Sequence, residues 1–146
     1  MDDWKSNSRM TLQQEIVISK NQIDVLRKHA RENMPNESCA ILFGKSKNTR
    51  FLTKEIFLTN NVEQSPVSFT ISNDELIRAY EQAENKNLEI IGIFHSHPDS
   101  VAYPSVTDQN YMKINPVPWI IFSNITDEFK GYILESKVVP IVVTVL

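Results

Sequence analysis

The strongest constraint on this chain is an apolar run that passes directly into two histidines. Residues 88–94 read LEIIGIF, and His95-Ser96-His97-Pro98 follow without a break. A run of this length is typical of a buried strand, whose side chains alternate between faces. His95 and His97 therefore project to one side, where we expect Ile91 and Ile93 to join them. Two imidazoles whose Cα atoms lie about 6–7 Å apart can converge on one small cation.

A carboxylate from the next element can complete a three-ligand site. Asp108 follows after a loop long enough to fold back over the strand end. Two imidazole nitrogens and one carboxylate oxygen suit zinc, one ion per chain with water as fourth ligand, and non-heme iron is the second choice. Ser105 and Asp108 also have the spacing of a capping box, in which Asp108 would serve a helix instead of a metal. Spacing alone leaves both readings open.

A zinc hydrolase also needs a general base that is not a ligand. Glu37 is the candidate by position, because it directly precedes the apolar strand predicted at 39–43; the alternative is a strand-entry residue without chemistry. Cys39 shares the face of Glu37 and is either a small buried hydrophobe or a thiolate ligand that would close the metal site. His29 is interpreted as a partly exposed surface histidine with no role.

The rest of the pattern predicts a single α+β domain, a mixed β-sheet flanked by helices. Residues 1–14 are predicted to be a flexible tail and residues 15–146 the folded domain. Helices are expected at 20–34, from 72 to about 87, and from 105. The first two begin at Ser19 and Ser72 with capping-box spacing. Strands are expected at 15–19, 39–43, 51–58, 67–71, 88–94, 118–122, 131–134 and 138–145, with residues 44–50 as a hairpin turn.

Charge and cysteine content exclude several function classes. The formal net charge is −3, and no basic stripe appears, so neither nucleic acid nor an anionic membrane is an expected partner. The single cysteine cannot form an internal disulfide, which favours a reducing compartment. The chain shows neither a signal-peptide pattern nor a spanning apolar run. A cytoplasmic location is the expectation.

Taken together, these residues resemble the JAMM motif of the MPN-plus metallopeptidases. That motif has an upstream glutamate, then His-x-His-Pro, six residues, and Ser-x-x-Asp. Here Glu37 precedes HSHP at 95–98, and DSVAYP separates it from SVTD at 105–108. PNESCAILFG at 35–44 is similar to the sequence around the family's glutamate. Gly92 also stands where the family tends to have glycine. Ala40 departs from the family's glycine, and its methyl group is expected to crowd the backbone near Glu37.

The resemblance implies an MPN/JAMM-like (cytidine-deaminase-like) fold and a role for each motif residue. His95, His97 and Asp108 would bind Zn²⁺, Glu37 would be general base and proton shuttle, and Ser105 would donate a hydrogen bond to the oxyanion. It also implies cleavage of isopeptide or peptide bonds at the C-terminus of a ubiquitin-like protein. The lack of long insertions favours a minimal enzyme of prokaryotic type. Alternatives are release of an amino acid from a ubiquitin-like sulfur carrier, or a non-catalytic MPN interaction scaffold.

Overall fold

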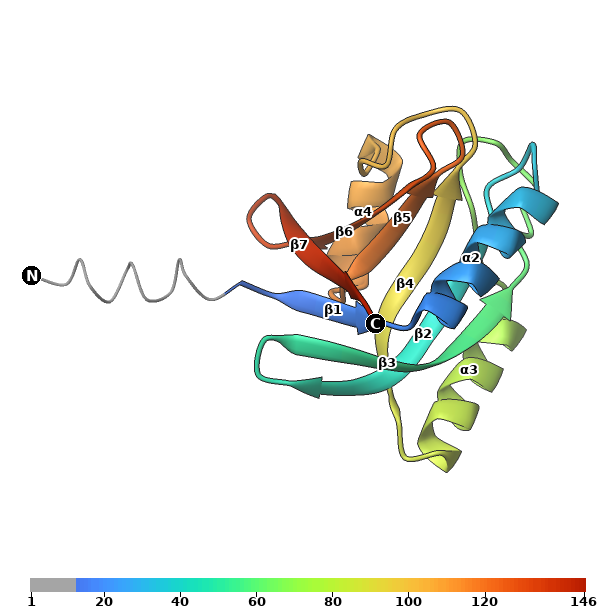
Figure 1. Cartoon of the computed structure of the whole chain (residues 1–146). Coiled ribbons are helices and arrows are strands. Elements are labelled where there is room, and N and C mark those ends of the chain that lie inside the picture. Colours follow the sequence, from blue (N-terminus) through green and yellow to red (C-terminus); the bar gives the residue numbers. More distant parts are fainter. Residues whose placement is uncertain (1–12) are drawn as a thin grey trace, which may run out of the picture.

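The computed structural model describes residues 13–146, which form seven strands and three helices (Figure 1). In chain order the elements are β1 (Glu15–Ile18), α2 (Lys20–Glu32), β2 (Cys39–Lys47), β3 (Arg50–Thr59), α3 (Asn73–Asn85), β4 (Glu89–His97), α4 (Val106–Ile114), β5 (Trp119–Ser123), β6 (Glu128–Leu134) and β7 (Val138–Val145). The tail predicted at 1–14 lies outside the described residues, except for its last two positions. At that border the carbonyl of Gln14 already accepts a hydrogen bond from Val142 of β7.

The seven strands close into a barrel in the order β1-β3-β2-β4-β5-β6-β7. β1 closes it by pairing in parallel with both β3 and β7, and β4 with β5 is the other parallel pair. The remaining neighbours are antiparallel. The predicted α+β class with a mixed sheet is confirmed. Closure was not predicted, and it removes the free edges of the sheet.

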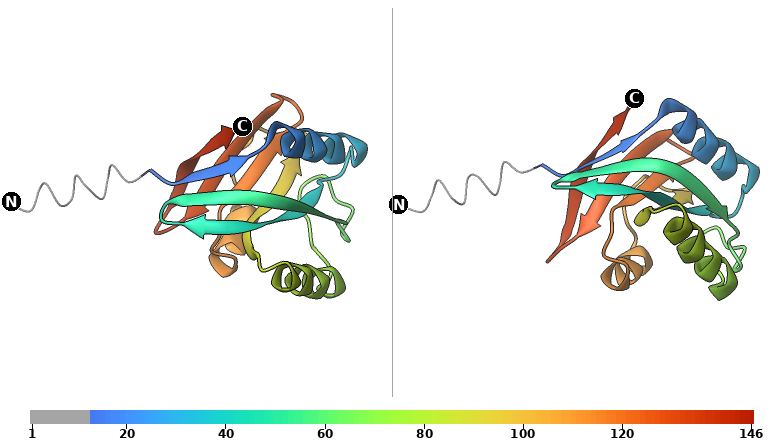
Figure 2. Two further views of the ribbon diagram at one scale, coloured as in Figure 1. Left: turned by 60° about the horizontal axis from the view of Figure 1, so that its bottom comes forward. Right: turned by 90° about the horizontal axis from the view of Figure 1, so that it is seen from below.

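Three apolar clusters fix the helices against this barrel. The largest combines strand residues with the buried face of α2, formed by Ile23, Leu26 and Ala30. α3 packs through Ala79 and Ala83 on a second cluster, and α4 packs on a third. Figure 2 shows α3 and α4 together on one side of the barrel, with α2 on another side. Leu76 of α3, Ile93 of β4 and Ile114 of α4 line one pocket between the two helices.

A β-bulge corrects the predicted face of Ile91. The register of β2 with β4 shifts between Leu42 and Phe43, which pair with Gly92 and Ile90. This shift reverses the alternation of β4, so that Ile91 enters the largest cluster while Ile93 stays with His95. A side chain at Gly92 would meet the Pro118 carbonyl at 3.2 Å, which explains the glycine where β5 approaches.

Several predicted boundaries change. Residues 67–71 form no strand, because Thr70 in this segment bonds to the loop at 61–62 rather than to a neighbouring strand. The hairpin turn contracts from 44–50 to Asn48 and Thr49, with Asn48 at a φ of 58°. The first helix ends at Glu32 and the second at Asn85. Strand β4 extends through both histidines instead of ending at residue 94.

Candidate active site

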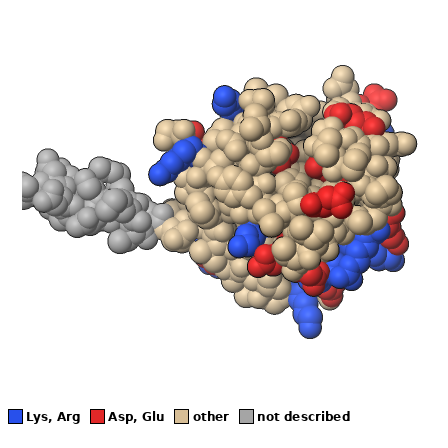
Figure 3. All heavy atoms as spheres, turned by 90° about the horizontal axis from the view of Figure 1, so that it is seen from above, with Lys and Arg blue, Asp and Glu red and all other residues tan. Residues whose placement is uncertain are grey.

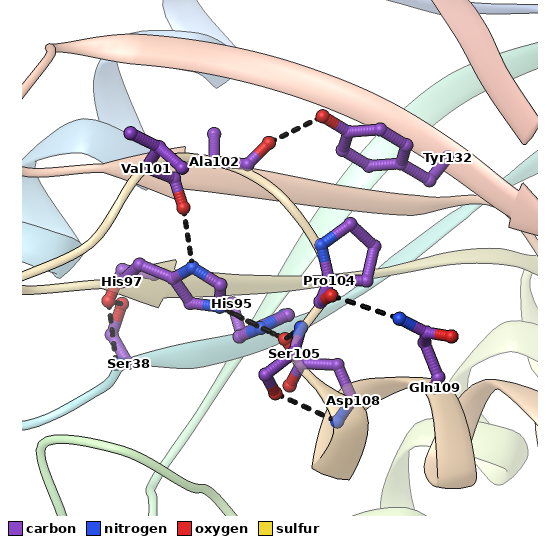
Figure 4. Close-up of polar contacts among 11 residues, drawn as sticks. Ser38, His95, His97, Val101, Ala102, Pro104, Ser105, Asp108, Gln109 and Tyr132 are labelled. Carbon is purple, nitrogen blue, oxygen red and sulfur yellow. Dashed lines mark hydrogen bonds and ion pairs between the residues drawn. The ribbon is translucent and has the colours of Figure 1, made fainter. Parts of the chain in front are cut away.

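The two histidines of β4 meet the first turn of α4 at the end of the barrel where β4 ends (Figures 1 and 4). The Nε2 atoms of His95 and His97 lie 3.1 Å apart, and Asp108 Oδ2 lies 3.1 Å and 3.0 Å from them. All three side chains are at most 4% exposed. Ligand atoms in a tetrahedral zinc site are about 3.3–3.4 Å apart when the bonds are 2.0–2.1 Å long. The triangle therefore has nearly the size that such a site requires.

The hydrogen-bond partners of His97 indicate that this triangle favours a cation. His97 Nδ1 lies 2.8 Å from the Val101 carbonyl, which only accepts, so Nδ1 carries a hydrogen. In the neutral ring, the Nε2 lone pair then points at His95 and at the Asp108 carboxylate. Lone pairs that face one another need a proton or a metal ion between them. The residues present therefore fit a metal bound by two imidazoles and a carboxylate.

Asp108 combines the two roles that its spacing left open. Its Oδ2 accepts from the Ser105 N–H at 2.9 Å, and its own N–H donates to Ser105 Oγ at 3.0 Å, which completes the capping box. The same oxygen faces both histidines. Burial acts to raise the pKa of Asp108, but the hydrogen bonds from His95 and His97 outweigh burial and hold it well below its ordinary value.

The two histidines differ in their electrostatics. Burial lowers the pKa of His95 below its ordinary value. Burial also acts to lower the pKa of His97, but the bonds to Asp108 and to the Val101 carbonyl outweigh it and raise the pKa. His95 is held from the other side by aromatic rings. Phe69 stacks on it with centroids 4.9 Å apart, and Trp119 packs edge-on at 5.5 Å.

Three side-chain donors fix the connection between β4 and α4, and Figure 4 shows two of them, His97 and Tyr132. The carbonyls of residues 100, 101 and 102 accept in turn from Ser123, His97 and Tyr132. Each donor comes from a different strand of the barrel. The loop between the two halves of the motif is therefore tied at successive residues, and this tie holds His97 in one ring orientation.

Glu37 lies beside the histidines, directly before β2. Its carboxylate is within 4.8 Å of the ligand atoms of His95 and His97, and the side chain is 3% exposed. Within residues 13–146, no polar atom is a hydrogen-bond partner of Oε1. Burial, and then the charge of Asp108, raise the pKa of Glu37 to about 8. A carboxyl group of this kind can both accept and donate a proton near neutral pH.

A pair of buried serines joins the glutamate segment to the histidine strand. The N–H of Ser38 donates to Ser96 Oγ at 2.9 Å, the two hydroxyls lie 2.9 Å apart, and the N–H of Ser96 donates to the Ser38 carbonyl at 3.1 Å. Ser96 stands between the two histidines, and Ser38 follows Glu37. The structure thus brings together Glu37, His95, His97 and Asp108, with Ser105 at the start of α4.

Cys39, Ala40 and His29, the other residues singled out in the sequence, lie outside the metal-ligand cluster. Cys39 is fully buried and accepts from Thr59 Oγ1 at 3.1 Å, and burial raises the pKa of its thiol to about 12. Ala40 enters the largest apolar cluster, where its methyl group is accommodated. His29 is partly exposed, as predicted, but it also makes hydrogen bonds that the sequence did not indicate. Its Nε2 lies 3.0 Å from the carbonyl of Cys39 and 3.1 Å from that of Thr59, so it joins α2 to the β2–β3 pair.

An apolar groove adjoins the site between α3 and α4. It encloses a cavity of about 190 Å³ with Ile93 and Trp119 beneath it, Tyr111 and Ile114 on one wall, and Phe69–Ile71 among its other lining residues. Sequence reasoning missed Phe69 and Trp119, although both belong to apolar stretches. Seen from above, much of the surface is uncharged, and the acidic side chains gather mostly on the right-hand half of the view (Figure 3). In the part of the chain that the structure describes, no helix is long and apolar enough to cross a membrane.

Comparisons with known proteins agree with the motif. Residues 19–132 match the family described as prokaryotic homologues of the JAB domain. A protein of Pyrococcus furiosus named desampylase is 42% identical over 101 residues, which are 69% of this chain and 69% of that protein. The CysO-cysteine peptidase of Mycobacterium tuberculosis is 31% identical over 93 residues, 64% of this chain and 62% of that protein.

A solved structure shows the same arrangement of elements. The solution structure of a protein from Desulfitobacterium hafniense superposes with a TM-score of 0.82 at 26% identity, covering 90% of this chain and 92% of that one. The predicted resemblance and the predicted fold are confirmed. On the family match over most of its length, the chain belongs to the prokaryotic homologues of the JAB domain.

Proposed function

We propose that this protein is a zinc metallopeptidase that hydrolyses the peptide or isopeptide bond at the C-terminus of a ubiquitin-like protein. The observation that carries the proposal is the convergence of His95, His97 and Asp108 within 3.1 Å of one another. Beside them lies Glu37, whose Oε1 has no hydrogen-bond partner among residues 13–146. These residues fit the family's ligand set and base. A scaffold that had lost catalysis would not need to retain all four.

Each residue has a distinct role in this reaction. When bound by His95, His97 and Asp108, zinc lowers the pKa of a water toward about 7 and polarises the substrate carbonyl. Glu37 accepts the proton of the attacking water at its carboxylate and later donates it to the departing amine. Ser105 Oγ accepts from the Asp108 N–H, so its own O–H remains available to donate to the developing oxyanion.

The segment 67–71 supports a mode of substrate binding. Thr70 bonds inward, its N–H to Asn61 Oδ1 at 3.1 Å and its carbonyl to the N–H of Val62 at 3.0 Å. The N–H and C=O groups of Phe69 and Ile71 make no hydrogen bond to any residue from 13 to 146. The extended tail of a ubiquitin-like protein pairs with these groups by strand addition and follows the groove to His95. Because the closed barrel has no free edge strand, this segment supplies the unpaired backbone groups that strand addition needs.

A second reaction uses the same groove. The similarity to a relative named CysO-cysteine peptidase favours release of an amino acid from the C-terminus of a ubiquitin-like sulfur carrier. Both reactions place an extended tail in the groove and a carbonyl at the metal. They differ only in the departing amine.

The test compares the wild-type protein with Glu37→Gln on two substrates, a linear fusion to a ubiquitin-like protein and a ubiquitin-like protein carrying one added C-terminal amino acid. Glutamine cannot accept the proton, so Glu37→Gln should keep its metal and lose about 10²–10⁴-fold in rate. Glu81→Gln, at an exposed acid of α3 whose side chain makes no described hydrogen bond, is the control and should retain activity. Mass analysis of the products identifies the bond that is cleaved. If the zinc-loaded wild-type protein cleaved neither substrate, the peptidase proposal would fail and the non-catalytic interaction scaffold would remain as the alternative.

A further inference from the structure

We infer that Asn61 is a positioning residue, which holds the base Glu37 and the substrate-pairing segment 67–71 in one fixed relation to the metal centre. The inference rests on the proposed function. Asn61 follows β3 in a loop that contains none of the motif residues, and its side chain is only 7% exposed. Buried amides of this kind are retained where their hydrogen bonds are satisfied.

The amide of Asn61 bonds to two separate segments. Its Nδ2 donates to the Glu37 carbonyl at 3.0 Å and to the Ser68 carbonyl at 2.9 Å, with a longer contact of 3.5 Å to the Ser65 carbonyl. Its Oδ1 accepts from the N–H groups of Glu63 and Thr70, both at 3.1 Å. Both ends of one side chain are thus used, and they join chain segments that precede β2 and follow β3.

Glu37 depends on such backbone bonds because its Oε1 lacks a hydrogen-bond partner in the part of the chain that the structure describes. No polar atom of the described chain holds Oε1, so the main chain sets where the carboxylate lies. The N–H of Glu37 donates to the Ser65 carbonyl at 2.8 Å, and the next residue is bonded to Ser96 of β4. Asn61 supplies the remaining bond, to the Glu37 carbonyl. Removing it frees the base on the side that faces the loop.

The same amide orients the segment proposed to pair with substrate. Its bonds to Ser68 and Thr70 fix the backbone of those residues, while the backbone groups of Phe69 and Ile71 have no hydrogen-bond partner among residues 13–146. The Phe69 ring is then stacked on His95 with centroids 4.9 Å apart. A displacement at Asn61 therefore acts on the base and on the substrate tail together, so both kcat and KM should change.

The test is Asn61→Ala in the full, zinc-loaded chain. We expect kcat to fall about 10- to 100-fold, the loss typical of a misplacement of about 1 Å, and KM to rise. The zinc content should stay at that of the wild-type protein. Hydrogen exchange of the Thr70 amide should accelerate, because its acceptor is removed. Asn60→Ala is the matched control, since its exposed side chain makes no described hydrogen bond.

Two further variants separate positioning from a general loss of stability. Ser72→Ala removes the N-cap of α3, so it should lower stability while kcat and KM stay unchanged. Asn61→Asp keeps the acceptor oxygen but replaces the donor, so Thr70 should remain protected while kcat falls; it carries the test should Asn61→Ala fail to fold.

The outcomes remain distinguishable from those of the proposed function. A wild-type protein that cleaves no substrate refutes the proposed function but leaves the exchange measurement intact. A folded Asn61→Ala protein with wild-type kcat, KM and Thr70 exchange would overturn the positioning role, as would Asn61→Asp with wild-type kcat.

Discussion

Replacement of Glu37 by glutamine should stabilise the metal-free protein, and increasingly so as the pH rises. The wild-type side chain is 3% exposed, and its pKa is raised from 4.5 to about 8, foremost by burial and then by the charge of Asp108. Folding therefore favours the protonated carboxyl. The unfolded chain releases this proton near pH 4.5, while the folded chain keeps it to about pH 8, so wild-type stability falls as the pH rises between these values.

The magnitude follows from the two pKa values. Integrating the proton linkage from pH 5 to pH 8 gives a loss of about 3 to 4 kcal/mol in the wild-type free energy of unfolding. Glutamine does not ionise, so Glu37→Gln escapes this loss. In a chain of 146 residues the difference corresponds to about 10 °C in Tm.

The assay is urea unfolding of both proteins at several pH values from 5 to 8, in the presence of a chelator. The difference in free energy of unfolding should be below about 1 kcal/mol at pH 5 and should widen toward pH 8. Glu63→Gln is a control of opposite sign. The hydrogen bonds from Thr70 and Ser68 lower the pKa of Glu63, so its loss should cost stability above pH 4.5.

Saturating zinc should shrink the difference between wild-type protein and Glu37→Gln, because a nearby cation favours the carboxylate. A difference that stays constant from pH 5 to pH 8 without metal would refute the reasoning. Glu37 would then be solvated, and the argument for a proton shuttle tuned by burial would fail with it.

Three further substitutions test the remaining roles. His97→Ala should lose most of the metal measured by elemental analysis, since His95 and Asp108 alone make a poor site, and full zinc occupancy would reject the ligand set. Ser105→Ala should lower stability by about 1 kcal/mol through loss of the N-cap and lower kcat roughly 10²-fold with a small change in KM, while loss of stability alone would leave only the capping role. Cys39→Ser should retain zinc and substantial activity, and X-ray absorption should detect nitrogen and oxygen ligands only; a sulfur at about 2.3 Å would contradict a catalytic site.

Short-range sequence patterns predicted where the first two helices begin. Ser19 with Gln22 predicted the start of α2, where the full capping box forms. Ser72 predicted the start of α3, although Glu75 accepts from the N–H of Asn60 instead of closing a box. Such signals depend on residues three or four positions apart, so the sequence displays them directly.

The spacing of the motif predicted which side chains meet at the candidate site. His95 and His97 share a strand face, and a loop of fixed length returns Asp108 to them. Spacing left undecided whether Asp108 caps a helix or faces the histidines. Only the folded chain answers this, because one carboxylate oxygen reaches both the Ser105 N–H and the two imidazoles.

Other features exist only in the tertiary structure. Barrel closure joins β1 to β7 across almost the whole chain, the β2–β4 bulge moves Ile91 to the other face, and His29 and Asn61 bond to carbonyls of distant segments. Neither residue belongs to a motif or a periodic pattern. An amide or imidazole side chain can bond to backbone groups wherever the fold brings unpaired ones together, and the sequence does not show where that is. The sequence alone determined the chemistry of the site and the order of its elements. The packing of remote segments decided where the base sits and where a substrate tail can lie, because those positions depend on hydrogen bonds between residues that no short window contains.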